Sequence, residues 1–145
     1  MEIHSNQEAL DKLEQLKQDL ANANKSGEPP KMNGIEQAET IWNAYHHSKF
    51  YGSVKDIAEY LDVSKPKVSN CITIMRNMVP PLREWFRETP YQVHSLYRVA
   101  THSKAYQEEF LKQQRLLSVT TVSDVLKVMD MKYDTLSQTV KGGEG

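Results

Sequence analysis

Hydrophobic residues recur every three or four positions along most of the chain, which is the period of an α-helix. No stretch of useful length alternates hydrophobic and polar residues as a half-buried β-strand does. The pattern therefore predicts an all-α protein. The expected helices cover residues 7–20, 35–45, 54–61, 65–78, 82–87, 91–101, 105–117 and 122–133.

The first of these helices is amphipathic and short. Leu10, Leu13 and Leu20 follow a heptad-like spacing, with Ile3 and Lys17 at the other seam positions. Because it spans too few heptads for a stable isolated coiled coil, it either packs on the body of the protein or pairs with a second copy.

Composition divides the chain into five segments. A stretch rich in Asn, Gly, Pro and Lys predicts a linker between the first helix and the main helical domain. A C-terminal helix, which either packs on the domain or pairs two protomers, and a disordered Gly-rich tail follow. The predicted segments are 1–22 (amphipathic helix), 23–33 (linker), 34–117 (main domain), 118–140 (C-terminal helix) and 141–145 (tail).

Residues Val54–Thr73 match the pattern of a helix-turn-helix, in which two helices cross around a very short turn. Ala58 is a small residue at the point where the second helix crosses close to the first, and Val63 fills the turn. Asp62 stands where glycine is usual, because the turn favours a positive φ angle that aspartate tolerates better than most residues. The inward side chains are Ile57 and Leu61 on the first helix and Val68, Cys71 and Ile72 on the second.

The second helix of this motif has a defined start and a polar, cationic outer face. Ser64 is placed to cap it, and Pro66 falls in its first turn, where its missing N–H costs nothing. No acidic residue occurs from Ser64 to Arg83. In such motifs the first part of the second helix reads base edges, and more distal groups meet phosphates. The base-reading candidates are Ser64, Lys65, Lys67, Ser69 and Asn70, and the backbone-contacting candidates are Lys55, Thr73 and Arg76.

The net charge of −1 conceals an uneven distribution. Residues 64–104 carry seven Lys/Arg against two Asp/Glu, whereas residues 1–63 carry six against eleven. A local excess of cations inside an acidic protein suits a surface that neutralises phosphates. Four further cations extend this predicted phosphate footprint: Arg83, Arg87, Arg98 and Lys104.

The stretch "NGIEQAETIWNAY…GSVKDIAEYLDVSKPKVSNCITIMRNM" resembles the central DNA-binding domain of the ParB-type partition proteins, a ParB/KorB-like helical domain. The resemblance rests on an entry helix with Glu36 and Ala38, on the serine and valine-serine-asparagine pattern of the second helix, and on the supporting helix "YQVHSLYRVA" at Tyr91–Ala100. It covers Asn33–Leu111. It implies binding to repeated or palindromic double-stranded DNA in plasmid or phage partition or in transcriptional regulation. The family's N-terminal nucleotide-binding domain has no counterpart in residues 1–33, so no CTP hydrolysis is expected.

Other chemistry is not indicated. The single cysteine, Cys71, excludes an intramolecular disulfide, and no Cys/His cluster has zinc-ligand spacing. The histidines lack carboxylate partners at useful spacing, and no phosphate loop or nucleophile motif occurs. We therefore expect a cytoplasmic, non-enzymatic protein with no cofactor, no metal, no membrane association and no small-molecule substrate.

Two interpretations of function stay open at this point. The first is a sequence-specific double-stranded DNA-binding protein, expected to act as a homodimer because two half-sites double the contacts; a partition motor protein is compatible with it as a further partner. The alternative is a protein–protein interaction adaptor whose basic face is incidental. The first predicts affinity for DNA that falls steeply with salt, and the second predicts none.

Overall fold

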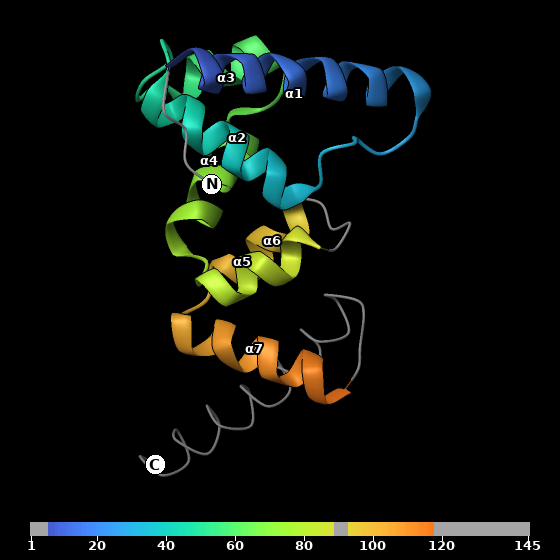
Figure 1. Ribbon diagram of the computed structural model, residues 1–145, viewed down its shortest axis with the longest axis vertical. Helices are drawn as coiled ribbons and strands as arrows, with labels where there is room; N and C mark the ends of the chain where they lie inside the picture. Colours follow the sequence, from blue (N-terminus) through green and yellow to red (C-terminus); the bar gives the residue numbers. More distant parts are fainter. Residues whose placement is uncertain (1–5, 89–92, 118–145) are drawn as a thin grey trace, which may run out of the picture. The chain divides into compact units, whose positions relative to one another are not determined.

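The computed structural model describes residues 6–88 and 93–117, and the secondary structure there is entirely α-helical (Figure 1). The expected all-α class is therefore confirmed. Most helix boundaries agree with the sequence pattern within a few residues. The helices are α1 (Asn6–Ser26), α2 (Gly34–His47), α3 (Val54–Leu61), α4 (Lys65–Asn77), α5 (Pro80–Arg87), α6 (Val93–Ala100) and α7 (Lys104–Leu117).

The chain divides into two compact units, Met1–Thr101 and His102–Gly145. The first unit contains α1 to α6, and the second contains α7. This division differs from the predicted main domain at 34–117, because the first unit includes the N-terminal helix and ends before α7. The predicted helix at 122–133 and the tail at 141–145 lie outside the described residues.

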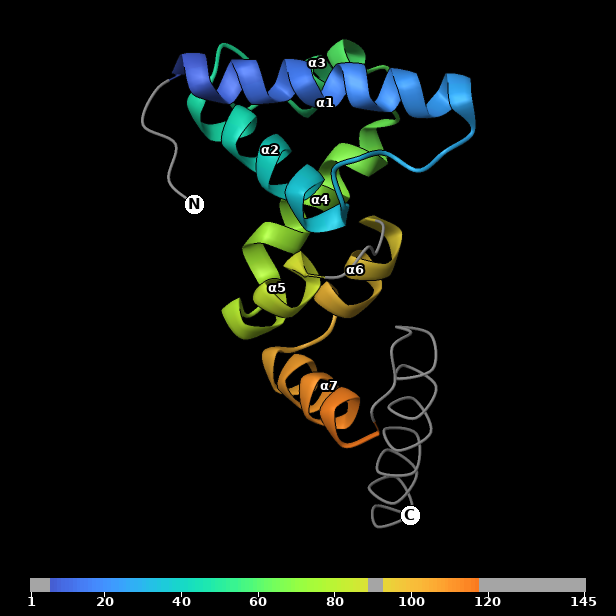
Figure 2. The same cartoon turned by 45° about the vertical axis from the view of Figure 1, so that its right-hand side comes forward.

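Helix α1 belongs to the core of the first unit. Ala9, Leu13, Leu16 and Leu20 are buried, and α1 lies across α2 and α3 (Figures 1 and 2). Leu13 and Leu20 of the predicted seam are buried as expected. Leu10 is half-buried and Lys17 is exposed, and the adjacent residues Ala9 and Leu16 are buried in their place. Of the two alternatives for this helix, packing on the body is the one the structure adopts.

The predicted linker at 23–33 is partly helical, because α1 continues to Ser26. Gly27 then ends the helix with a φ of +76°, a left-handed conformation that glycine adopts without steric cost. The segment that follows is tied back to α1, since the Asp19 carboxylate accepts the backbone N–H groups of Lys31 and Met32 at 2.8 and 2.9 Å. These bonds hold the connection against α1.

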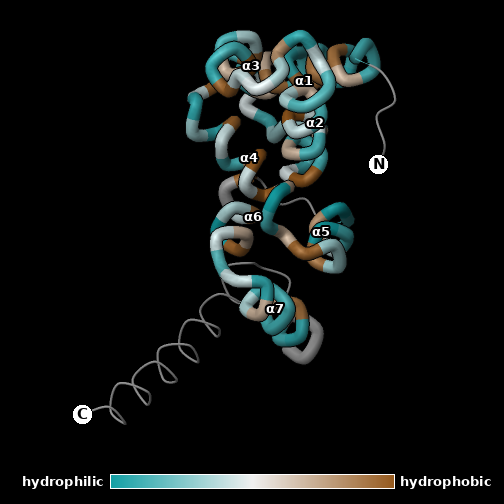
Figure 3. Tube along the Cα trace, turned by 90° about the vertical axis from the view of Figure 1, so that its left-hand side faces the viewer, coloured by the Kyte–Doolittle hydropathy of each residue, from teal (hydrophilic) through white to brown (hydrophobic). Residues whose placement is uncertain are grey.

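Helices α2 and α4 form the centre of the first unit. Helix α2 contacts α1, α3, α4, α5 and α6, and α4 contacts α2, α3 and α6. Asn33 starts α2 with a capping box: its side chain accepts the N–H of Glu36, whose carboxylate accepts the N–H of Asn33. Hydrophobic positions are interspersed with hydrophilic ones along the helices, as in amphipathic helices (Figure 3).

The Pro80-Pro81 pair begins α5 instead of only ending the preceding helix. Both prolines fit the first helical turn, where no intrahelical N–H bond is lost, so α5 starts two residues before the predicted position. Helix α4 ends at Asn77, whose side-chain amide donates to the carbonyl oxygen of Ala100 at the end of α6. This bond fixes the end of α4 against α6.

Candidate nucleic-acid interface

Helices α3 and α4 are joined by the three residues Asp62, Val63 and Ser64. Asp62 has φ +57° and ψ +50°, the left-handed conformation expected at this position from the sequence. It is the one non-glycine residue with positive φ among the described residues. The N–H of Val63 then donates to the carbonyl oxygen of Ala58 at 3.0 Å, which closes the turn.

Serine side chains cap both helices. The Ser53 hydroxyl accepts the N–H of Asp56 at 3.1 Å, and the Ser64 hydroxyl accepts the N–H of Lys67 at 3.3 Å. Pro66 lies in the first turn of α4. The predicted start of this helix is confirmed, and Ser64 has a structural role in addition to its predicted contact with a base.

The inward faces of α3 and α4 pack as expected. Ile57, Ala58 and Leu61 on α3 and Val68, Cys71 and Ile72 on α4 are all buried. Burial raises the pKa of the Cys71 thiol to about 12, and the positive charge of Lys67 offsets only part of this. The face of α4 opposite this stripe is therefore the one left to solvent.

The predicted contact residues of α3 and α4 lie on that solvent side to different degrees. Lys55, Ser64, Lys65, Ser69 and Arg76 are exposed. Lys67, Asn70 and Thr73 are half-buried, with part of each side chain accessible. The outer face of α4 thus presents cations and short hydrogen-bonding groups and carries no carboxylate of its own.

Arg87, predicted to contact phosphate, is instead used inside the fold. Its guanidinium forms an ion pair with Glu39 on α2 and a second one with Glu84 at 3.4 Å. Burial alone would lower the pKa of Arg87, but the hydrogen bond and charge of Glu39, helped by Glu84, raise it instead. Two carboxylates already neutralise this cation, which makes it a poor phosphate ligand.

The other three predicted cations are dispersed. Arg83 on α5 is half-buried, Arg98 on α6 is exposed, and Lys104 at the start of α7 is exposed but belongs to the second unit. The sequence placed these residues in one basic segment. One of them lies on each of the helices α5, α6 and α7.

Sequence reasoning did not identify an aromatic cluster at the end of α2. The ring of His46 lies 4.1 Å from that of Trp42 and 5.1 Å from that of Tyr45, measured between centroids. Burial, followed by the charges of His47 and Arg76, lowers the pKa of His46 below its ordinary value. The histidines were assessed from the sequence only for metal and acid–base chemistry. The spacing of four residues between Trp42 and His46 on one helix was the signal for this ring contact.

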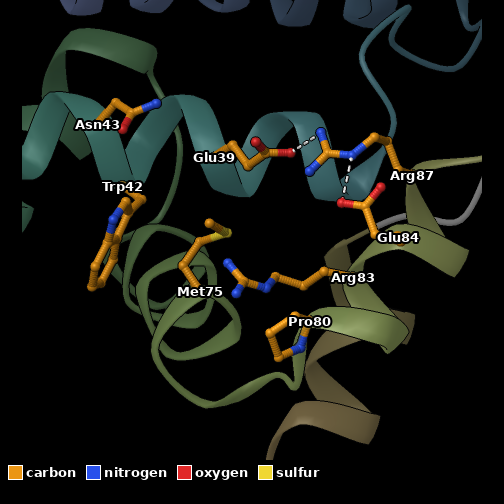
Figure 4. Close-up of a pocket in the computed structure, with 8 residues that line it drawn as sticks. All are labelled: Glu39, Trp42, Asn43, Met75, Pro80, Arg83, Glu84 and Arg87. Atoms are coloured by element: carbon orange, nitrogen blue, oxygen red, sulfur yellow. Dashed lines mark hydrogen bonds and ion pairs between the residues drawn. The ribbon is translucent and has the colours of Figure 1, made fainter. Parts of the chain in front are cut away.

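A polar pocket of about 260 Å³, also missed by sequence reasoning, lies between α2, α4 and α5 (Figure 4). Its residues come from segments more than thirty positions apart, so no local motif marked it. The lining residues are Glu39, Trp42, Asn43, Met75, Pro80, Arg83, Glu84 and Arg87.

Comparisons with protein-family models, with curated proteins and with solved structures find no match to this chain. Among the described residues no group of three or more His, Cys, Asp or Glu side chains is arranged to hold a metal ion. No helix in residues 6–88 and 93–117 combines the length and apolarity needed to cross a membrane.

Proposed function

We propose that this chain is a sequence-specific double-stranded DNA-binding protein in which α3, the turn at 62–64 and α4 form a helix-turn-helix. The observation that carries the proposal is the outer face of α4, which is acid-free, cationic and solvent-accessible, on a helix whose start is fixed by the Ser64 cap. A helix with these properties suits the major groove, where short polar side chains meet base edges and cations meet phosphates.

Residues on α4 divide into two roles by their distance from its N-terminus. Lys65, Lys67, Ser69 and Asn70, together with Ser64, are proposed to face base edges. Lysine addresses the O6 and N7 atoms of guanine, and asparagine addresses the N6 and N7 atoms of adenine. Lys55, Thr73 and Arg76 are proposed to contact the sugar-phosphate backbone. Arg87 is left out of this set because Glu39 and Glu84 occupy its guanidinium.

The resemblance of Asn33–Leu111 to the ParB-type DNA-binding domain supports a role in plasmid or phage partition or in transcriptional control. Both roles use the same recognition chemistry. A homodimer that binds repeated or palindromic sites follows from the need for two half-sites. Sedimentation of the protein free and bound to a two-site duplex tests this, and a monomer in both conditions would contradict it.

The direct test selects DNA from a random or genomic fragment pool on the immobilised protein and sequences what is retained. The enriched site is then used in gel shifts with a Lys67→Ala, Asn70→Ala double variant, which we expect to lose specific binding. The matched control changes the exposed pair Asn24 and Lys25 on α1 to alanine, which also removes one asparagine and one lysine.

Salt dependence provides a second measurement on the same complex. Binding of DNA should weaken steeply as salt increases, because phosphate contacts release counterions. Arg76→Gln should weaken binding to all sequences and reduce the slope of log K against log salt by about 1. No enrichment of any sequence, together with no affinity for any duplex at low salt, would overturn the proposed function.

A further inference from the structure

The pocket between α2, α4 and α5 has the chemistry of a small-molecule site. It has a volume of about 260 Å³ and is lined by charged, polar, aromatic and thioether side chains. Figure 4 places Trp42 and Met75 on one side of it and the ion pair of Arg87 with Glu39 at the other end. Five of the eight lining side chains are charged or polar, so polar groups would hold a ligand here, and Trp42, Met75 and Pro80 supply the apolar contact.

The guanidinium of Arg83 lines this pocket and forms no ion pair among the described residues. Its side chain extends from α5 toward Met75 (Figure 4), and its Nε atom is buried without a hydrogen-bond acceptor among the described residues. The neighbouring Arg87 differs, because its guanidinium is held by both Glu39 and Glu84. Because the Nε atom is closed off from solvent, a ligand in the pocket reaches Arg83 through the other nitrogens of its guanidinium. Charge-assisted hydrogen bonds from these nitrogens would stabilise a bound carboxylate.

The charges around the pocket restrict the kind of ligand. Two arginines face two glutamates, so a simple anion would gain from Arg83 but would also meet the carboxylates of Glu39 and Glu84. Glu84 is 71% exposed and makes a single ion pair at 3.4 Å, so its carboxylate has capacity for a second cation. A zwitterion satisfies both needs, because its carboxylate faces Arg83 and its ammonium faces Glu84.

We propose that this pocket binds a free α-amino acid with an apolar side chain. The carboxylate accepts from Arg83, the ammonium donates to Glu84, and the apolar side chain lies between Trp42 and Met75. A planar carboxylate matches the fixed fork of a guanidinium, and the volume suits a ligand the size of leucine, methionine or tryptophan.

Met75 connects the pocket to α4, the helix proposed to enter the major groove. It lines the pocket and lies on α4 directly before Arg76. A ligand that holds Met75 and Arg83 together fixes the last turn of α4 relative to α5. The amino acid therefore acts as an effector that changes the affinity for DNA, and DNA changes the affinity for the amino acid by the same factor. This second part rests on the proposed function, whereas binding of the amino acid does not.

Isothermal titration calorimetry of the full chain without DNA tests the binding. The probes are L-leucine, L-methionine and L-tryptophan, with 4-methylpentanoate and 3-methylbutylamine as leucine analogues that lack the ammonium or the carboxylate. We expect at least one amino acid to bind, both analogues of leucine to bind more weakly than leucine, and Arg83→Gln to weaken binding by about tenfold or more. Lys25→Gln, in the last turn of α1, is the control: it also removes one positive charge, from a residue that does not line the pocket.

A folding control and a second variant distinguish loss of the binding site from loss of the fold. Circular dichroism and the unfolding midpoint establish that Arg83→Gln is folded. Glu84→Gln, at the exposed end of the pocket, is an independent variant that should weaken binding of the amino acid but not of 4-methylpentanoate, whose carboxylate is freed from the repulsion of Glu84. Absence of binding by all three amino acids, or equal binding by wild type and Arg83→Gln, overturns the inference. Calorimetry and gel shifts together separate the two proposals. DNA binding without an amino acid site removes only this inference. An amino acid site without DNA binding removes the proposed function and the effector role that rests on it, and leaves the site.

Discussion

The carboxylate of Glu39, on α2, holds the guanidinium of Arg87, on α5, and the Glu39 side chain is only 8% exposed. The main-chain carbonyl oxygen of the same arginine accepts from the Asn33 side chain at 3.0 Å. Arg87 therefore links the end of α5 to the start and the middle of α2. This linkage explains why a residue predicted to contact phosphate serves the fold.

Glu39→Gln should lower the free energy of unfolding by about 1–2 kcal/mol, because it removes the buried charge that pairs with a partly exposed guanidinium. Urea unfolding monitored by circular dichroism measures the change. Glu84→Gln is the matched control: it removes the exposed partner of the same arginine and should cost less than about 0.5 kcal/mol. Equal losses in the two variants would contradict the assigned importance of Glu39.

The turn between α3 and α4 makes a prediction about Asp62. Its left-handed backbone is strained for side chains with a branched Cβ, so Asp62→Val should destabilise the protein by about 1–2 kcal/mol. Asp62→Gly should be neutral or stabilising, because glycine adopts this conformation without steric cost. Thermal unfolding of the two variants measures the difference. A valine variant as stable as the glycine variant would show that the turn does not have this conformation.

His46 makes the stability of the protein depend on pH. Since its folded-state pKa is lowered from the ordinary 6.5, the unfolded chain binds a proton more readily than the folded one. The contribution of His46 to stability is therefore present above pH 6.5 and is lost as the pH falls through its lowered folded-state pKa. The groups that face it are Trp42, Tyr45, His47 and Arg76.

Thermal unfolding of wild type and His46→Gln between pH 8 and pH 5 isolates this contribution. The loss of stability on acidification should be smaller in His46→Gln than in wild type. His47→Gln, which changes an exposed neighbour, should retain most of the wild-type loss. Identical pH profiles for wild type and His46→Gln would rule out the assignment.

Cys71 should be unreactive in the folded protein. Its thiol is buried in α4 and its pKa is raised to about 12, so almost no thiolate is present at pH 8. A colorimetric thiol reagent should detect no thiol in native protein and one thiol per chain in guanidinium chloride, since the sequence contains one cysteine. Rapid labelling of the native protein would mean that α4 does not pack as described.

Much of the helical layout of this protein could be predicted because the signals are local. The hydrophobic period located the helices, and Ser64, Pro66 and Asp62 defined the turn, since caps and left-handed positions depend on neighbouring residues only. The predicted main domain at 34–117 leaves the first helix outside, because the leucines of that helix could equally have faced a second copy. An amphipathic pattern predicts that these side chains are buried, but it does not identify the surface against which they pack.

The capped start of α4 and its exposed polar face were predictable from the sequence, whereas the ion pair of Arg87 and the pocket at Arg83 were not. The role of Arg87 depends on Glu39, forty-eight positions earlier, and a charge count along the sequence cannot detect such a pair. The pocket at Arg83 likewise requires α2, α4 and α5 to meet. Because of such long-range contacts, cations that look equivalent in the sequence have different partners in the folded protein.

The position of Lys17, whose ammonium lies 4.4 Å from the centre of the Tyr60 ring, places α1 directly over α3. A minimal fragment starting near residue 34, as the predicted segments suggest, would strip this cover from α2 and α3 and expose their apolar faces to water. Such a fragment would aggregate or fold poorly, and its failure to bind DNA would say nothing about α4. Anyone who trims this protein for crystallography or NMR should keep its first helix.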